Sequence, residues 1–267
     1  MRKIGKCALC RRDGQELQDS HYLPAGVYRV LRDENAADGN PNPILFHAEA
    51  AVQTSKQITD YLLCRDCELR LSRNGEDYFL KCCWRRNGFR LHATLDAATP
   101  SVVAGQIKVY AAAKFQEIDV GALTYFGASM FWRDSVHYWK SRNYASEQIQ
   151  LGPYEEQFRT YLMGETQFPG DCVLWVSVPD RITPIAALSL TPYGGTNLNG
   201  IRLYKLVVLG IGFMLYVGKA LTPEHRELCF VRGTGHPLYK TDLLEQGMIN
   251  DLSRMFRSSP RLAEGPK

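Results

Sequence analysis

The sequence predicts an α+β protein with a small metal-binding part at the N-terminus and a larger part built on a mostly antiparallel sheet. Three observations predict this fold class. Two CxxC pairs lie at 7–10 and 64–67, an aromatic-rich stretch of helical length covers 116–140, and apolar runs of strand length follow between 172 and 219. A helix that is aromatic on most faces belongs in a core. Runs rich in Val, Ile and Leu that end at Pro or Gly are typical of strands.

The composition is that of a globular protein. Of the 267 residues, 45% are hydrophobic and 22% are charged, which is ordinary for a chain that buries a sizeable core. The longest uncharged apolar run, 206–218, is shorter than the ~20 residues of a spanning helix, so no membrane association is expected. The first residues are basic and lack the apolar stretch of a signal peptide, which favours a cytoplasmic location. The cysteines are then expected to be thiols or metal ligands and not disulfides.

The first 95 residues are expected to form the metal-binding domain. A short helix is predicted at 25–32, and the polar segment 33–43, DENAADGNPNP, is typical of a loop inserted between the two cysteine pairs. The small-residue stretch 96–105 is the predicted domain boundary. Residues 106–257 are then expected to form the α+β domain, and 258–267 a disordered tail.

The second domain is expected to pack helices on a sheet. Besides the long buried helix at 116–140, a short helix is predicted at 152–164, where Pro153 suits a first turn and Gly164 an end. Strands are predicted at 172–178, at 184–190 and within 201–219. A final amphipathic helix is predicted at 242–256.

The two CxxC pairs are the most specific motif in the chain. Each spacing lets both thiolates of a pair reach one ion, and four thiolates satisfy the tetrahedral coordination of zinc. The predicted ligands are Cys7, Cys10, Cys64 and Cys67. Because four protein ligands leave no open position, the zinc is expected to be structural. Four unconnected buried cysteines are the alternative, and a redox CxxC would not explain the second pair.

Three motifs, CALC at 7–10, SHYLP at 20–24 and YLLCRDCE at 61–68, together resemble the HNH branch of the ββα-metal (His-Me finger) endonucleases. The resemblance covers about the first 80 residues. With FWRDS at 131–135 and LGPYEEQFR at 151–159, the chain also resembles a group of uncharacterised bacterial proteins, which brings no established activity.

The HNH resemblance implies a treble-clef zinc domain and a catalytic role for His21 as the general base that activates water against a phosphodiester. Histidine suits this work because its ordinary pKa is close to neutral. The resemblance also implies one divalent ion, Mg²⁺ or Mn²⁺, beside that histidine. Ser20 stands where these nucleases usually place an aspartate ligand, and Glu68 where they often have a histidine. A rearranged ion site with Glu68 and Asp19, or with Asp60, is therefore expected.

Two of these residues have structural alternatives. His21 could hydrogen-bond backbone in the knuckle or cover the zinc cysteines from outside the coordination sphere. Glu68 could simply begin a helix, where a carboxylate is favoured near the positive end.

An arginine cluster with interleaved aromatics follows the second cysteine pair. Guanidinium groups beside Trp84 and Phe89 suit phosphate contact and base stacking, while a solvated surface is the alternative. The candidate nucleic-acid-binding residues are Arg65, Arg70, Arg73, Arg85 and Arg86. The net charge of +4, with its basic excess mainly in the first 95 residues, is compatible with such a partner.

The sequence therefore favours a metal-dependent endonuclease that acts on DNA or RNA. The alternative is a non-catalytic zinc-binding module that recognises nucleic acid or a protein partner. A role in bacterial defence against foreign DNA is implied only by the resemblance.

Overall fold

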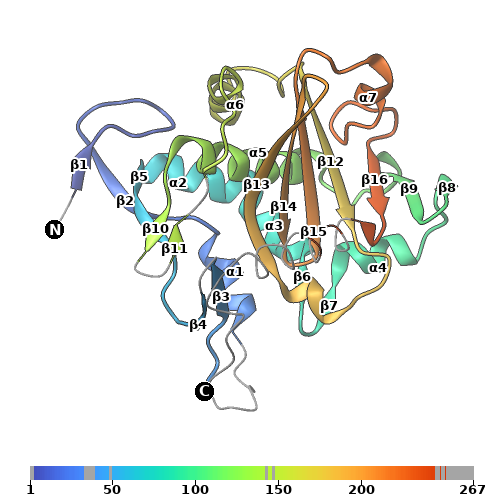
Figure 1. The fold of residues 1–267 in the computed structure, drawn as a ribbon, viewed down its shortest axis with the longest axis horizontal. Coiled ribbons are helices and arrows are strands. Elements are labelled where there is room, and N and C mark those ends of the chain that lie inside the picture. Colours follow the sequence, from blue (N-terminus) through green and yellow to red (C-terminus); the bar gives the residue numbers. More distant parts are fainter. Residues whose placement is uncertain are drawn as a thin grey trace.

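The computed structural model describes residues 3–32, 40–47, 50–141, 144–145 and 148–243, with 247 and 250. Its helices and strands confirm the α+β class (Figure 1). Most of the predicted helix at 242–256 and the whole predicted tail at 258–267 lie outside the described residues.

The N-terminal part is a three-stranded antiparallel sheet followed by helices. Its strands are β1 (Lys3–Gly5), β2 (Gln15–His21) and β5 (Thr59–Cys64), in the order β1-β2-β5. The connection from β2 to β5 contains helix α1 (Ala25–Leu31) and the two-stranded β3 (Ile44–His47) and β4 (Ala50–Gln53). Helix α2 (Arg65–Leu71), the π-helical turn η1 (Ser72–Glu76) and α3 (Asp77–Cys82) follow β5 without a break.

A short hairpin and one helix link this part to the main sheet. The hairpin is β6 (Trp84–Arg85) with β7 (Gly88–Phe89), and the helix is α4 (Arg90–Asp96). Strand β8 (Val102–Ala104) then pairs with β9 (Ile107–Ala111) inside the main sheet. Part of the small-residue stretch 96–105 is thus sheet and not linker.

The main sheet has seven strands in the order β13-β14-β15-β12-β16-β9-β8. The strands not yet located are β12 (Cys172–Val178), β13 (Ser189–Leu198), β14 (Ile201–Val208), β15 (Ile211–Val217) and β16 (Pro237–Lys240). Only the pair β12 and β16 is parallel, which confirms a mostly antiparallel sheet. Residues 184–187 form a 3-10 turn, η3 (Pro184–Ala187), so the predicted strand at 184–190 is wrong over its first half.

Helix α5 (Val120–Val136) runs through the centre of the molecule (Figure 1). Its residues from Ala122 to Ser135 are all buried, as a helix that is apolar on most faces requires. Phe126 stacks on Phe79 of α3 at 3.7 Å between ring centroids and meets Phe213 of β15 at 5.7 Å. The helix therefore joins the N-terminal helices to the main sheet in one hydrophobic core.

Two helices and one strand pair complete the fold. Helix α6 (Tyr154–Met163) ends at Gly164, whose φ of 77° favours glycine, and it packs on α5. Helix α7 (Pro223–Glu227) lies beside the main sheet, on the opposite side of the molecule from β1 (Figure 1). The two-stranded β10 (Lys140–Ser141) and β11 (Tyr144–Ala145) follow α5. None of the helices in the described ranges combines the length and apolar composition needed to cross a membrane.

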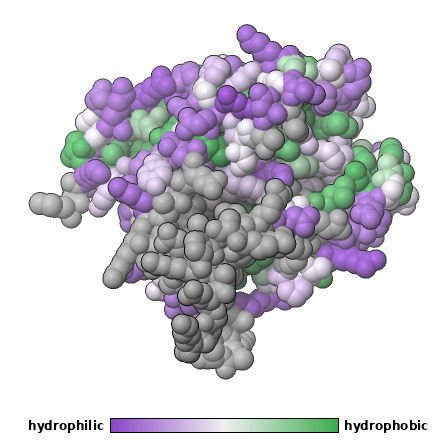
Figure 2. All heavy atoms as spheres, in the orientation of Figure 1, coloured by the Kyte–Doolittle hydropathy of each residue, from purple (hydrophilic) through white to green (hydrophobic). Residues whose placement is uncertain are grey.

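The edge of the main sheet at β8 is apolar. Val102 and Val103 are 55% and 61% exposed, and Figure 2 shows hydrophobic side chains gathered at this edge, while hydrophilic ones dominate the top of the view. A strand of three residues limits the length of this open edge.

Gly75 lets η1 cross α5 closely. A Cβ atom at Gly75 would lie 2.8 Å from the backbone nitrogen of Phe126. Because that neighbour is helix backbone, Gly75→Ala is expected to destabilise the protein by about 1–3 kcal/mol through overpacking. Gly170→Ala is the matched control, since a Cβ there meets nothing within 4 Å. Urea denaturation of both variants measures the difference, and equal stabilities would contradict the close crossing.

Candidate functional site

Four cysteines at one end of the N-terminal sheet converge on one point. The sulfur atoms of Cys7, Cys10, Cys64 and Cys67 all lie within 4.8 Å of one another. Tetrahedral zinc with Zn–S bonds of ~2.3 Å would separate its sulfurs by roughly 3.8 Å, and the Cys10 and Cys64 sulfurs are 3.9 Å apart. The four thiols could therefore hold a metal ion such as zinc, as the spacing predicts.

Local backbone geometry explains why these thiols meet. The turn after Cys7 closes with a bond from the Arg11 N–H to the Cys7 carbonyl at 2.9 Å, and Ala8 N–H donates to Leu62 on β5 at 3.1 Å. Cys64 ends β5, and its N–H donates to the Cys7 sulfur at 3.3 Å. Cys67 follows on the first turn of α2, so a hairpin end and a helix start present both pairs to the same ion.

The electrostatics of the cluster suit a cation. Hydrogen bonding between the Cys67 and Cys7 thiols lowers the pKa of Cys7 and raises the pKa of Cys67. Burial raises the pKa of Cys64. One thiolate is thus stabilised by its neighbours' S–H groups, and a bound metal would replace the shared protons and hold the sulfurs as thiolates. This donor set fits zinc.

His21 is the last residue of β2. Its ring is half-buried and lies 6.4 Å from the ring of Tyr28 on α1. Its backbone carbonyl accepts a 2.8 Å hydrogen bond from Arg133 Nη1. Beyond it, the Tyr22 N–H donates to the Ile58 carbonyl at 2.9 Å, which closes the long connection between β2 and β5. The backbone of His21 is therefore held on both sides.

The residues beside His21 point to the two opposite faces of the β2–β5 pair. His21 pairs with Thr59, Ser20 with Asp60 and Asp19 with Tyr61, and successive residues of a strand point to opposite faces. Asp19 is exposed and shares its face with His21. Ser20 is 1% exposed, and its hydroxyl accepts a hydrogen bond from the Leu63 N–H at 3.1 Å.

Asp60 is engaged by a histidine from another element. Its Oδ2 lies 3.0 Å from Nε2 of His137, directly after α5. Burial would raise the pKa of Asp60, but hydrogen bonds from the Tyr61 N–H and from His137 outweigh burial and lower it. Asp60 lies on the Ser20 face, which separates it from Asp19 and His21.

Glu68 carries a polar atom without a partner. It lies in the first turn of α2, and its Oε1 is buried with no hydrogen-bond partner among the described residues. In the part of the chain that the structure describes, the four cysteines are the only group of three or more potential ligands close enough for one ion. His21, Asp19 and Glu68 are therefore not gathered into a three-ligand cluster.

Two charged residues of α5, Arg133 and Asp134, hold the N-terminal part. Arg133 is 2% exposed and bonds His21, Tyr22 and the carboxylate of Glu76, the last at 2.7 Å. Asp134, fully buried, accepts the hydroxyl of Tyr22 and the N–H of Ile149. The FWRDS motif thus serves as the buried contact behind SHYLP, which no spacing in the sequence indicated.

The candidate nucleic-acid arginines occupy different places. Arg70 donates to the Met163 carbonyl at the end of α6, at 3.2 Å, and Arg73 is exposed on η1. Arg65 lines a shallow pocket beside Cys64. Arg85 and Arg86 line a different pocket together with Arg29 and Arg32 of α1. Sequence reasoning missed these last two, although a separation of three residues on a helix places them on one face.

Comparisons of the chain with protein-family models, with curated proteins and with solved structures found no match.

Proposed function

We propose that this protein is a metal-dependent endonuclease whose N-terminal part is a treble-clef zinc domain of the HNH type. The observation that carries the proposal is the order of its elements. A cysteine turn leads into β2, which ends at His21, and β5 leads directly into α2, which supplies Cys67 and Glu68. The two strands pair antiparallel, the second is followed directly by a helix, and His21 ends the first strand.

The buried, unpaired Oε1 of Glu68 supports a divalent ion in this unit. A buried carboxylate oxygen is costly unless a donor or a cation satisfies it. Mg²⁺ keeps several waters and needs only one or two protein carboxylates besides substrate phosphates, so the Glu68 carboxylate alone could hold such an ion. When bound, the ion would stabilise charge on the reacting phosphate.

His21 would do the proton transfer. Its imidazole takes a proton from water as the water oxygen bonds to phosphorus, and the bond from phosphorus to the leaving sugar oxygen breaks. Solvent then protonates the leaving oxygen. Arg133 contributes by holding the His21 carbonyl, which leaves the ring free to meet substrate at the end of β2.

His21→Ala is expected to lower the cleavage rate of DNA or RNA by about 10²–10⁴-fold, because a positioned general base contributes that much. The assay incubates the protein with single- and double-stranded DNA and RNA in Mg²⁺ or Mn²⁺. Glu68→Gln is expected to raise the metal concentration needed for half-maximal rate. His225→Ala, on the remote α7, is the matched control and should cleave like the wild type.

Cleavage that survives in His21→Ala at the wild-type rate, or no cleavage of any substrate, would contradict the catalytic role. A non-catalytic zinc-binding module would then be the function that the same fold supports.

A further inference from the structure

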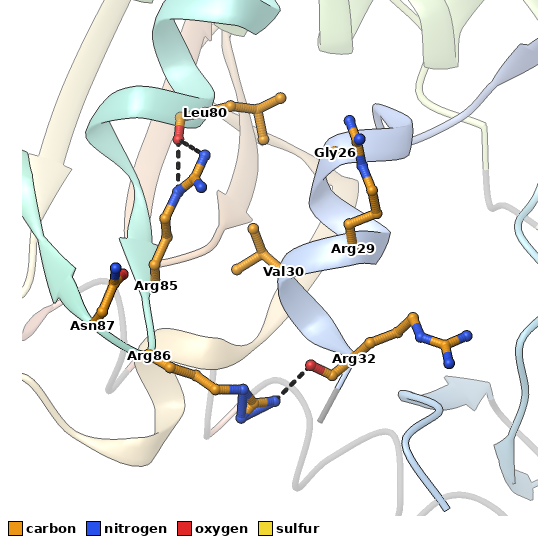
Figure 3. A pocket seen from close by; sticks show the side chains of 8 residues that line it. All are labelled: Gly26, Arg29, Val30, Arg32, Leu80, Arg85, Arg86 and Asn87. Carbon is orange, nitrogen blue, oxygen red and sulfur yellow. Dashed lines mark hydrogen bonds between the residues drawn. The ribbon is translucent and has the colours of Figure 1, made fainter. Parts of the chain in front are cut away.

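A pocket of about 520 Å³ lies between α1 and the hairpin β6–β7, away from the cysteine cluster. One wall is α1, with Gly26, Arg29, Val30 and Arg32, and the other is Leu80, Arg85, Arg86 and Asn87 (Figure 3). The walls meet at Gly26, where a Cβ atom would lie 2.3 Å from Leu80. A glycine thus allows the close approach that forms the pocket floor.

The lining carries four arginines and no acidic residue. Four like charges around one concave surface repel one another, and the pocket is stabilised when an anion enters it.

Two of the guanidinium groups are held in place without loss of charge. Arg85 donates from Nε and Nη2 to the Leu80 carbonyl at 3.0 and 2.5 Å, and Arg86 donates to the Arg32 carbonyl at 2.8 Å (Figure 3). Because a backbone carbonyl is neutral, these hydrogen bonds orient the two side chains without cancelling their charge. Arg29 makes no hydrogen bond or ion pair with any other described residue, and its five N–H donors are available to a ligand.

We propose that this pocket binds the phosphodiester backbone of a nucleic acid. Arginine forks match phosphate oxygens in a bidentate manner, and several of them along one groove suit successive phosphates better than a single small anion. Helix α1 also connects the pocket to His21, because Tyr28 on α1 lies beside the His21 ring. A strand bound along α1 would pass from the arginines toward His21. This inference rests on the proposed function, whose substrate it would position.

The test measures binding of a fluorescent 20-nucleotide single-stranded DNA by anisotropy, without added divalent ion so that no cleavage occurs. Arg29→Glu is expected to weaken binding at least about tenfold, and Arg29→Ala to reduce the slope of log affinity against log salt by about one. Arg86→Ala is a second variant on the opposite wall. Arg181→Glu is the control, because Arg181 is exposed and lies after β12, outside the pocket.

Equal losses in Arg29→Glu and Arg181→Glu would show a general charge effect and overturn the site, as would unchanged binding in both pocket variants. A parallel titration uses ATP. ATP that binds as tightly as the oligonucleotide, and weakens equally in Arg29→Glu, would overturn the assignment to a polynucleotide.

The proposed hydrolysis is tested separately from the pocket. His21→Ala should bind the oligonucleotide like the wild type, so pocket-dependent binding without cleavage would keep the pocket and remove only the catalytic role of His21.

Discussion

Cys67→Ala is expected to remove the metal from the protein and to unfold its N-terminal part. The four sulfurs lie within 4.8 Å of one another, and they join the cysteine turn to the start of α2. Structural zinc sites bind with apparent free energies of about 10–16 kcal/mol, which is folding free energy because the site does not exist in the unfolded chain. Loss of one of four ligands should remove several kcal/mol of it, and the remaining thiols would then repel as they ionise.

Elemental analysis and thermal melting followed by circular dichroism measure this effect. The wild type should contain one zinc ion per chain. Cys83→Ala is the matched control, because Cys83 is equally buried but lies outside the cluster; it should keep the zinc. A zinc-free wild type, or a Cys67→Ala variant that keeps both its zinc and its melting temperature, would contradict the assignment.

The second large effect is expected at Arg133, which joins the N-terminal sheet to α5. Its guanidinium donates to the carbonyls of His21 and Tyr22 at 2.8 and 3.1 Å and to Glu76 at 2.7 Å. Arg133→Ala would leave two carbonyls and a mostly buried carboxylate unpaired. Breaking one side of a buried ion pair costs about 3–5 kcal/mol, and the same loss of free energy of unfolding is expected here.

Urea denaturation of Arg133→Ala, of Glu76→Gln and of the double variant tests this contact. Because Glu76→Gln removes the charge that Arg133→Ala leaves unpaired, the double variant should lose less than the sum of the two single losses. Arg90→Ala, an exposed arginine on α4, is the control and should change stability by less than about 0.5 kcal/mol. A loss below about 1 kcal/mol in Arg133→Ala, or additive losses in the double variant, would mean that the contact carries little stability.

Local patterns predicted the elements whose structure depends on near neighbours. The aromatic stretch at 116–140 became α5, with each end four residues inside the prediction. At the start, Asp119 caps the helix by accepting the Ala122 N–H. The run 172–178 became β12 without change of bounds. The run 201–219 became β14 and β15, joined at Gly210 with a φ of 77°. The first half of 184–190 failed because apolar residues beside a proline also suit a 3-10 turn.

Contacts between distant segments could not be predicted in this way. Strand β16 pairs in parallel with β12. Strands β8 and β9 belong to the same sheet although they precede α5 in the sequence and the other strands follow it. No sequence pattern in these strands indicates which strand each one pairs with. The arginine pocket joins 26–32 with 80–87, and the close approach at Gly26 and the hydrogen bond from Arg86 to the Arg32 carbonyl hold these segments together.

For the candidate site, the sequence by itself predicted the four cysteines that the structure brings together, because a CxxC turn sets the separation of two sulfurs within four residues. It also identified the residue types around His21. Only the tertiary structure decided that Ser20 points into the interior, that His137 engages Asp60 and that Arg133 holds the His21 carbonyl. The physical reason is that strand register assigns each side chain to a face, and the partner strand of β2 is β5, which follows a long connection in the chain.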